Sequence, residues 1–406
     1  MNLLPTESFD ALKVARYQIR LRALEPAQFP AFAGSALRGA FGHALKSSVC
    51  VMQHRDCERC LVASRCIYPN VFEPEFPPHL TEWQNERNAP SPYLLDPPVH
   101  RKRIESVPEA VATGSGSMII AAESADSVPH AVPNQTNQRR PPKWERHRQL
   151  AGGEEIEFGL TLLGRAIEHL PFIVLAIHEM TQRGIGAPQF ERPSLSDTPS
   201  AAETVLEPEA APRRQMPPRP RFALAEVVLL AADGQRRTIY TEASERLESP
   251  AAPPPSLRQL VEHRLTEIEA SGQLRLRFLT PARIKVDGDL QPRADFALLV
   301  RNLLRRVSML TAVHGEAKLA LDYRQLIARA AEVQTAASEL RWWDLQRYSA
   351  RQHTKLKLGG FVGSASYAGA ALGEFLPLLV AGEILRIGKG TSFGLGKFQI
   401  EPMEAR

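Results

Sequence analysis

The chain has 406 residues, of which 43% are hydrophobic and 23% charged, and its formal net charge is +5. A chain of this length and composition can bury two hydrophobic cores of ordinary size, which excludes a wholly disordered protein. No uncharged stretch reaches the roughly 18 to 20 residues that a membrane helix needs, and the first residues do not resemble a signal peptide, so we expect a cytoplasmic protein without a membrane partner. The small positive excess supports a nucleic-acid partner only weakly, so the placement of arginine and lysine matters more.

The first half of the chain begins with a predicted strand at Ala15 to Arg22, where apolar residues alternate with arginine and glutamine. This alternation is typical of a strand with one buried face. A helix is predicted at Ser35 to Ser48, with Ser35 as its N-cap. The same half then continues with a strand at Glu155 to Leu163, a helix at Arg165 to Gln182, a glycine turn at Arg183 to Gly186 and a strand near Phe222 to Leu230.

Two stretches of the first half, about 105–153 and 194–219, are rich in small residues, proline and glutamate or glutamine. Such compositions cannot bury enough apolar surface to fold, so we expect disordered inserts there. Ser249 to Pro255 is a proline-rich run that is typical of a stiff linker. The predicted organisation is therefore a first domain at 1–248, a linker at 249–256 and a second domain at 257–406.

The second half repeats the order of elements predicted for the first. Its strands are expected at Leu274 to Phe278, Gly360 to Ala368 and Lys397 to Ile400, and its helices at Phe296 to Leu310 and Leu372 to Leu385. Strand, helix, strand, helix, strand in duplicate favours an α+β protein built from two tandem ferredoxin-like (RRM-like) domains. The cysteine-rich segment and the disordered loops would then be insertions into the first domain.

The predicted helix at Ser35 to Ser48 carries the candidate catalytic residues. Leu37, Phe41 and Leu45 share one face, and the other face presents Arg38, Gly39, Gly42, His43 and Lys46. Each glycine costs about 1 kcal/mol relative to alanine inside a helix, so we expect close approach of a neighbouring element or of RNA. RNA cleavage without a metal ion needs a base for the 2′-hydroxyl and cations for the phosphate. His43 suits the first role, and Lys46 and Arg38 suit the second.

All four cysteines fall in one short segment, at Cys50, Cys57, Cys60 and Cys66. Disulfides are not expected in a reducing cytoplasm, and four clustered thiols with one C-x2-C pair suit a tetrahedral metal ion. We expect structural zinc, with an iron–sulfur cluster as the alternative. No cofactor is expected for catalysis itself.

The segment before the C-terminus holds a glycine-rich loop between a predicted helix and the last strand. Bare backbone amides with lysine and arginine between them can approach a polyanion closely. The loop is not a Walker A loop, because Gly390 follows Lys389 where a Ser or Thr would hold Mg²⁺. It is not a dinucleotide fingerprint either, because it follows a predicted helix and precedes a strand. We therefore predict that the loop contacts an RNA backbone. The predicted RNA-binding residues are Arg386, Gly388, Lys389, Gly390, Gly394, Gly396 and Lys397.

Several of these motifs together resemble a known family. The run Gly34 to Gly42, the cysteine segment followed by Tyr68 to Pro74, and the loop Gly388 to Gly396 resemble CRISPR-associated precursor-crRNA processing endoribonucleases, the Cas-six family of the RAMP superfamily. In the second half, the resemblance extends to Phe278 to Pro281, Leu303 to Arg306, Arg347 to Ser349 and Gly359 to Gly363. The glycine-rich loop that closes the second ferredoxin-like domain is the shared hallmark of that superfamily.

The resemblance implies metal-independent cleavage of CRISPR repeat RNA in the precursor transcript, leaving a 2′,3′-cyclic phosphate, with the mature guide passed to Cas effector subunits. Members commonly use a histidine in the first domain, and its position varies. Relatives that carry a histidine before the glycine-rich loop differ from this chain, which has Arg386 there. Sister RAMP families hold RNA without cutting it, so a non-catalytic crRNA-binding subunit is the alternative.

Overall fold

The structure is a computed structural model of the chain. It describes all residues except 1–2, 31, 53–55, 84–85, 87, 99–147, 188–217, 269–271, 350–353 and 402–406. Most of the two predicted inserts therefore lies outside the described residues. Among the described helices, none is both long and apolar enough to cross a membrane.

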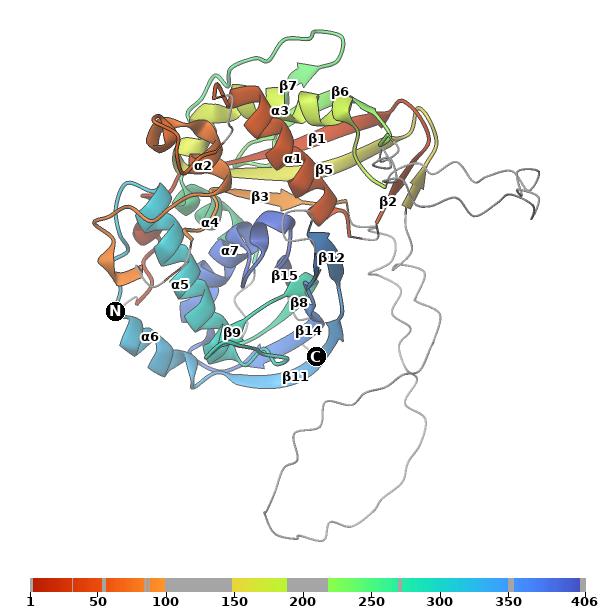
Figure 1. Ribbon diagram of the computed structural model, residues 1–406. Helices are drawn as coiled ribbons and strands as arrows, with labels where there is room; N and C mark the ends of the chain where they lie inside the picture. Colours follow the sequence, from red (N-terminus) through yellow and green to blue (C-terminus); the bar gives the residue numbers. More distant parts are fainter. Residues whose placement is uncertain are drawn as a thin grey trace, which may run out of the picture.

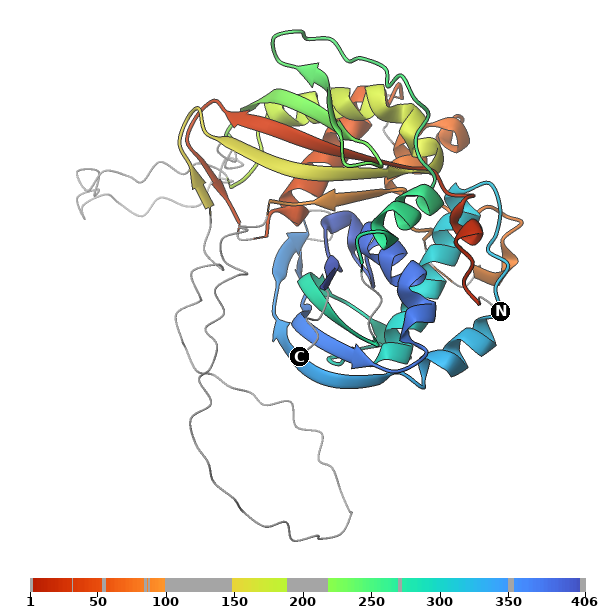
Figure 2. The same cartoon turned by 180° about the vertical axis from the view of Figure 1, so that it is seen from behind.

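The first half forms a five-stranded antiparallel sheet in the order β3-β5-β1-β6-β7. Its central strand β1 buries Tyr17, Ile19 and Leu21, while the arginines between them lie on the other face, as the alternation predicts. Helices α1 and α3 pack side by side on the buried face (Figures 1 and 2). The elements of this half are β1 (Val14–Ala23), α1 (Gly34–Val49), α2 (Ile67–Phe72), β3 (Tyr93–Asp96), β5 (Glu155–Leu163), α3 (Leu170–Arg183), β6 (Phe222–Leu230) and β7 (Arg236–Thr241).

The second half forms a four-stranded antiparallel sheet in the order β11-β14-β8-β15. Helices α5 and α7 supply much of the apolar cluster that covers one face of this sheet. The elements of this half are α4 (Leu257–Leu265), β8 (Gln273–Ala282), α5 (Phe296–His314), α6 (Tyr323–Ala330), β11 (Gln334–Trp343), β14 (Gly360–Ala368), α7 (Leu376–Leu385) and β15 (Phe398–Glu401).

Both sheets have the ferredoxin-like order, which confirms the predicted fold class. In each, the first strand lies between the third and the fourth, and the second strand is next to the third. The prediction of three strands per half was wrong, because the first sheet also contains β3 and β7 and the second also contains β11. Every position of β11 is exposed or half-buried, so its sequence shows no apolar alternation that would predict a strand.

Shorter elements connect these two sheets and their helices. The ribbons are β2 (Ala27–Phe29) with β4 (Arg148–Leu150), β9 (Lys285–Val286) with β10 (Asp289–Leu290), and β12 (Gln346–Ser349) with β13 (Thr354–Lys357). The 3₁₀ helices are η1 (Thr6–Phe9), η2 (Ala63–Arg65), η3 (Thr81–Trp83), η6 (Gly164–His169), η7 (Leu372–Phe375) and η8 (Thr391–Phe393). Strand β4 corrects the predicted disorder at its positions, because its backbone pairs with β2.

The N-terminal segment packs with the second half of the chain rather than the first. Leu4, Phe9 and Leu12 belong to the apolar cluster beneath the second sheet. The carbonyl of Pro255, at the end of the proline-rich run, accepts a hydrogen bond of 2.9 Å from the amide of Val14 at the start of β1. The N-terminal segment and the end of the proline-rich run therefore connect the two ferredoxin-like units.

Candidate nucleic-acid interface

Helix α1 has one buried face and one open face. Leu37, Phe41 and Leu45 are buried in the first core, as predicted. The helix begins at Gly34 with Ala33 as its N-cap and no side-chain cap, so the predicted capping role of Ser35 was wrong. Its first turn instead packs against the glycine-rich loop, since a Cβ on Gly34 would lie 1.8 Å from the carbonyl oxygen of Phe393.

The two interior glycines of α1 have different surroundings. A Cβ on Gly42 would come within 2.2 Å of the Phe72 ring, so this glycine admits α2. A Cβ on Gly39 would meet nothing within 4 Å. His43 lies one turn after Gly39 and is exposed, and within the described part of the chain no hydrogen bond or ion pair to it is present. Gly39 and His43 therefore form the open face of the helix.

Arg38 bridges the two halves of the chain. Its guanidinium lies 4.2 Å from the Phe72 ring centroid and 4.5 Å from that of Phe393, and its Nε donates a 3.2 Å hydrogen bond to Ser392 Oγ. Cation–π and hydrogen-bond contacts of this kind hold a side chain in place. Arg38 thus connects α1 to the glycine-rich loop, which differs from the predicted free cation beside the scissile phosphate.

Two cations, Lys46 of α1 and Arg183 of α3, lie at the second half of α1. Lys46 Nζ lies 5.0 Å from the Tyr68 ring centroid and lines the pocket of the cysteines. Arg183, at the end of α3, donates a 2.9 Å hydrogen bond to Ser47 Oγ, one turn beyond His43. The sequence analysis placed Arg183 only in a glycine turn. Its position beside α1 depends on the packing of α3 against α1, which no local sequence signal reports.

Several backbone amides of the glycine-rich loop donate hydrogen bonds to other residues of the chain. The Gly388 amide donates to Asn302 Oδ1 at 2.9 Å, that of Gly394 to the Thr391 carbonyl at 2.9 Å, and that of Gly396 to the Pro281 carbonyl at 3.0 Å. All four loop glycines have φ between 73° and 87°, a region that favours glycine. The prediction that these amides contact RNA is therefore corrected for these three residues. Lys389 is exposed at the tip of the loop.

A buried group of charges joins the loop to the first sheet. Arg386 is 5% exposed and forms an ion pair with Asp96 of β3, and Lys397 Nζ lies 3.1 Å from the other oxygen of that carboxylate. Burial raises the pKa of Asp96, but Arg386 and Lys397 outweigh it and hold the pKa below its usual value. Because Arg386 is buried in this pair, its predicted contact with RNA is corrected to a contact between the two halves.

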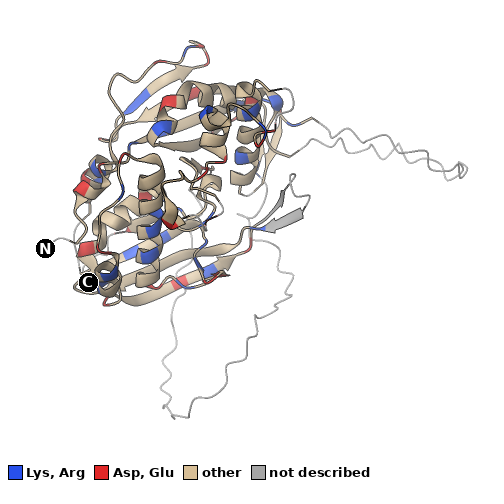
Figure 3. Cartoon of the chain, turned by 60° about the vertical axis from the view of Figure 1, so that its left-hand side comes forward, with Lys and Arg blue, Asp and Glu red and all other residues tan. Residues whose placement is uncertain are grey.

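A second cation, which is half-buried, lies beside this group. Arg306 of α5 donates a 2.7 Å hydrogen bond from Nε to the Leu385 carbonyl. Burial of the guanidinium, together with the nearby Arg386, lowers the pKa of Arg306 to about 9. Elsewhere, basic and acidic positions are interleaved along the ribbon (Figure 3), as in the ion pairs of Arg275 with Glu339 and Glu401. The second sheet does not present a purely basic face.

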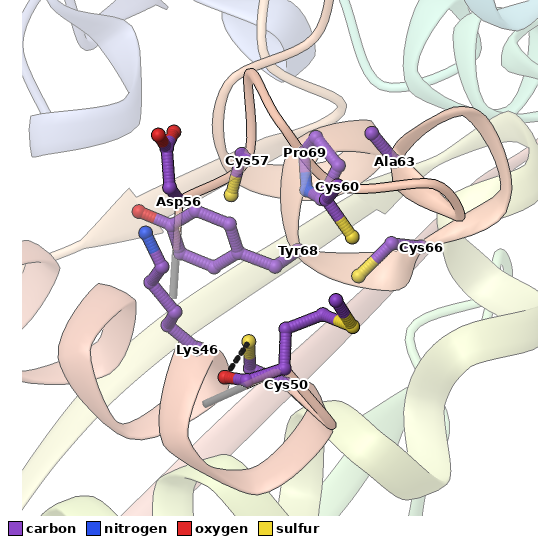
Figure 4. Close-up of a pocket in the computed structure, with 10 residues that line it drawn as sticks. Lys46, Cys50, Asp56, Cys57, Cys60, Ala63, Cys66, Tyr68 and Pro69 are labelled. Carbon is purple, nitrogen blue, oxygen red and sulfur yellow. Dashed lines mark hydrogen bonds between the residues drawn. The ribbon is translucent and has the colours of Figure 1, made fainter. Parts of the chain in front are cut away.

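The four cysteines line a single pocket at the end of α1. Cys57, Cys60 and Cys66 approach it from the segment before α2, and Cys50 from the end of α1, with Lys46 and Tyr68 beside them (Figure 4). All four are free thiols and half-buried. As placed, no three His, Cys, Asp or Glu side chains among the described residues are close enough together to share a metal ion. The structure therefore brings the predicted ligands to one pocket without forming a closed site.

The structure has two ferredoxin-like units in tandem, with a glycine-rich loop before the last strand of the second. This is the architecture that the resemblance to the RAMP superfamily implied. The model of the CRISPR-associated endoribonuclease Cas6 matches residues 276–398. The N-terminal domain model AF_1859_N matches residues 12–112 and 139–252, which is just over half of the chain. The second half of the chain therefore carries a Cas6 domain, and the first half an AF_1859_N domain.

Solved structures with similar folds include several Cas6 proteins. Cas6 of Thermus thermophilus is 14% identical, with 96% of this chain and 99% of that chain covered and a TM-score of 0.43. A partial Cas6-RT-Cas1–Cas2 complex is 10% identical, with 96% and 46% covered and a TM-score of 0.48. A RAMP protein binding different RNA substrates is 10% identical, with 95% and 99% covered and a TM-score of 0.36. Among curated protein sequences, none matches this chain significantly.

Proposed function

We propose that this protein is an endoribonuclease that cleaves CRISPR repeat RNA within the precursor transcript to release mature crRNA. The observation that carries the proposal is the open face of α1, where an exposed histidine and an unobstructed glycine lie one turn apart on the helix that contacts the glycine-rich loop. An RNA backbone could approach this face without displacing any described side chain. Mature crRNA would then pass to other Cas subunits.

The proposed reaction needs no metal ion. His43 accepts the proton of the 2′-hydroxyl, the 2′-oxygen attacks the adjacent phosphorus, and the bond to the 5′-oxygen breaks. The products are a 2′,3′-cyclic phosphate and a leaving 5′-oxygen, which takes up a proton from water to become the 5′-hydroxyl. Arg183 is the cation whose hydrogen bond to Ser47 places it beside the same face of α1, so it could stabilise the charge on the phosphate.

A specific observation favours the alternative of a non-catalytic crRNA-binding subunit. Three residues were predicted to act in catalysis. Two of them, Arg38 and Lys46, make cation–π contacts with aromatic rings of this chain. A binding subunit needs an exposed basic loop but not an assembled acid and base. The two functions therefore differ in the role of His43 rather than in the role of the loop.

The test is cleavage of labelled repeat RNA from the protein's own locus, without added divalent cations, in the presence and absence of EDTA. A single cut that leaves a cyclic phosphate in both conditions supports the proposal. Binding without cutting favours the alternative function. Loss of cutting in EDTA that Mg²⁺ restores contradicts the metal-independent reaction.

The identity of the base is tested by His43→Ala. We expect cleavage to fall by at least about 100-fold, as for the loss of a general base, while RNA affinity changes by less than about threefold. The matched control is His178→Ala, which removes an exposed histidine from α3. Equal loss in both variants, or full activity of His43→Ala, contradicts the role of His43.

A further inference from the structure

The segment from Cys50 to Cys66 lacks the apolar packing that normally holds a loop of this size. Leu61 is 94% exposed, Val51 83% and Val62 49%. Among its described residues, the only regular element is a single turn of 3₁₀ helix, η2, at Ala63–Arg65. Small segments without a core of their own are usually held by disulfides or a metal ion. The four cysteines form no disulfide, so their thiols are free to act as ligands.

The chemistry of the pocket suits one particular class of ion. Four thiols line it, two of them in a C-x2-C pair, and the other lining residues include the ammonium of Lys46. Thiolate ligands select zinc or iron–sulfur clusters, and four thiolates with one ion of charge +2 leave a net negative site that a nearby lysine stabilises. The small lining suits a single ion better than a cluster with its bridging sulfides.

As placed, the thiols of the four described cysteines are not close enough together to share an ion, so binding requires these side chains to move towards one another. Cys50 Sγ is now directed at the Met52 carbonyl oxygen at 3.7 Å, a weak contact that an ion would replace. Cys66 is the N-cap of α2, so its ligation would fix the start of that helix. The exposed apolar side chains of the segment present little packing that would oppose this movement.

Ligation would also reach the catalytic helix. Phe72, the last residue of α2, packs against Gly42 and beneath the guanidinium of Arg38. An ion held at Cys66 therefore positions α2, and α2 positions the turn of α1 that precedes His43. We propose that Cys50, Cys57, Cys60 and Cys66 bind one zinc ion, and that this ion holds α2 against the open-faced helix α1.

The first test measures metal content by mass spectrometry on the full-length protein purified without chelator. We expect one zinc per chain in the wild type and in Ser64→Ala, a control within the same segment. Cys57→Ser and Cys60→Ser should lose most of the zinc. Protein without metal, iron in place of zinc, or zinc content unchanged by both cysteine variants would overturn the proposal.

The second test keeps the proposal falsifiable if the cysteine variants fail to fold. A strong chelator is added to the wild-type protein, and thermal unfolding is followed before chelation, after chelation and after zinc is restored. We expect the midpoint to fall by several degrees and to recover with zinc, since binding to the folded state alone adds stability. An unchanged midpoint despite removal of zinc contradicts a structural role. Neither test involves RNA, so both are independent of whether the chain cleaves it.

Discussion

Lys389 is the exposed cation at the tip of the glycine-rich loop, and its proposed partner is an RNA phosphate. A cation that contacts phosphate displaces about one condensed counterion, so Lys389→Ala should weaken RNA binding and reduce the slope of log K against log salt by about 0.7 to 0.9. Filter binding over a series of salt concentrations measures this slope. Lys318→Ala is the control, because Lys318 pairs with Glu82 instead. Identical slopes for Lys389→Ala and the wild type would refute the phosphate contact.

His314 is a half-buried histidine whose role is structural. Its Nε2 is 2.6 Å from the Pro90 carbonyl oxygen, and burial lowers its pKa to about 4, with nearby Arg306 adding to the effect. A histidine with a lowered folded-state pKa stays neutral in the fold, while the unfolded chain takes up a proton below about 6.5. Stability should therefore fall as the pH drops from about 6.5 towards 4, by at most roughly 3 kcal/mol.

Urea unfolding of the wild type and of His314→Gln, measured from pH 7.5 to pH 4.5, checks this dependence. Gln can still donate to the Pro90 carbonyl but does not titrate. The variant should therefore lose part of the decline seen in the wild type over this range. The same decline in both proteins would show that other groups cause it.

The sequence predicted which side chains of α1 are buried, but not what its polar side chains contact. Leu37, Phe41 and Leu45 follow the helical period, which is a local signal. The partner of Arg38 is Ser392, 354 positions later in the chain, so only the packing of the two halves brings them together. The same holds for Arg386. Its position in a basic loop predicted a contact with RNA, but its partner is Asp96 of β3.

At the scale of elements, α1 carries two glycines that predict opposite effects of substitution. Gly39→Ala places a methyl group in open space and should stabilise the protein by up to about 1 kcal/mol through helix propensity. Gly42→Ala places its methyl group against Phe72, whose ring is held by Arg38, Tyr68 and Tyr93, and should destabilise by about 1 to 3 kcal/mol. Thermal unfolding of both variants gives the signs.

The same pair tests whether RNA uses the open face. If the backbone of the RNA approaches α1 at Gly39, the more stable Gly39→Ala should nevertheless bind or cleave repeat RNA less well. A variant that is both more stable and fully active would show that RNA does not come close to this turn.

The elements that sequence patterns predicted are those with a strong apolar period. Strands β5, β6 and β14 have the bounds expected from the sequence, and β1 and α5 differ only at their ends. Strand β11 could not be found this way, because an exposed edge strand buries no face and is held by its backbone pairing with β14. The four-residue strand β3 is too short to show a period.

For the whole molecule, the glycine-rich loop is where the two ferredoxin-like units meet. Gly34 and Arg38 of α1 contact Phe393 and Ser392, and a Cβ on Gly394 would lie 2.2 Å from Pro97, just after β3. The Asp96 carboxylate joins Arg386 at one end of the loop to Lys397 at the other. A change at this carboxylate should therefore affect the relative placement of the two units.

Asp96→Asn tests this connection. Because the folded-state pKa of Asp96 is held below its usual value, its ion pairs contribute stability above about pH 4, and this contribution is lost as the pH falls through the folded pKa. At pH 7 the variant leaves Arg386 buried without its counter-charge, and we expect a loss of roughly 1 to 3 kcal/mol. This lies below the value for a fully buried pair, because the Asp96 side chain is 27% exposed.

Urea unfolding at pH 7 and near pH 3 measures this effect. The difference in unfolding free energy between variant and wild type should be smaller in acid. Asp289→Asn, at an exposed carboxylate of β10, should differ little from the wild type at either pH. A gap of equal size at both pH values would mean that Asp96 acts through packing rather than charge.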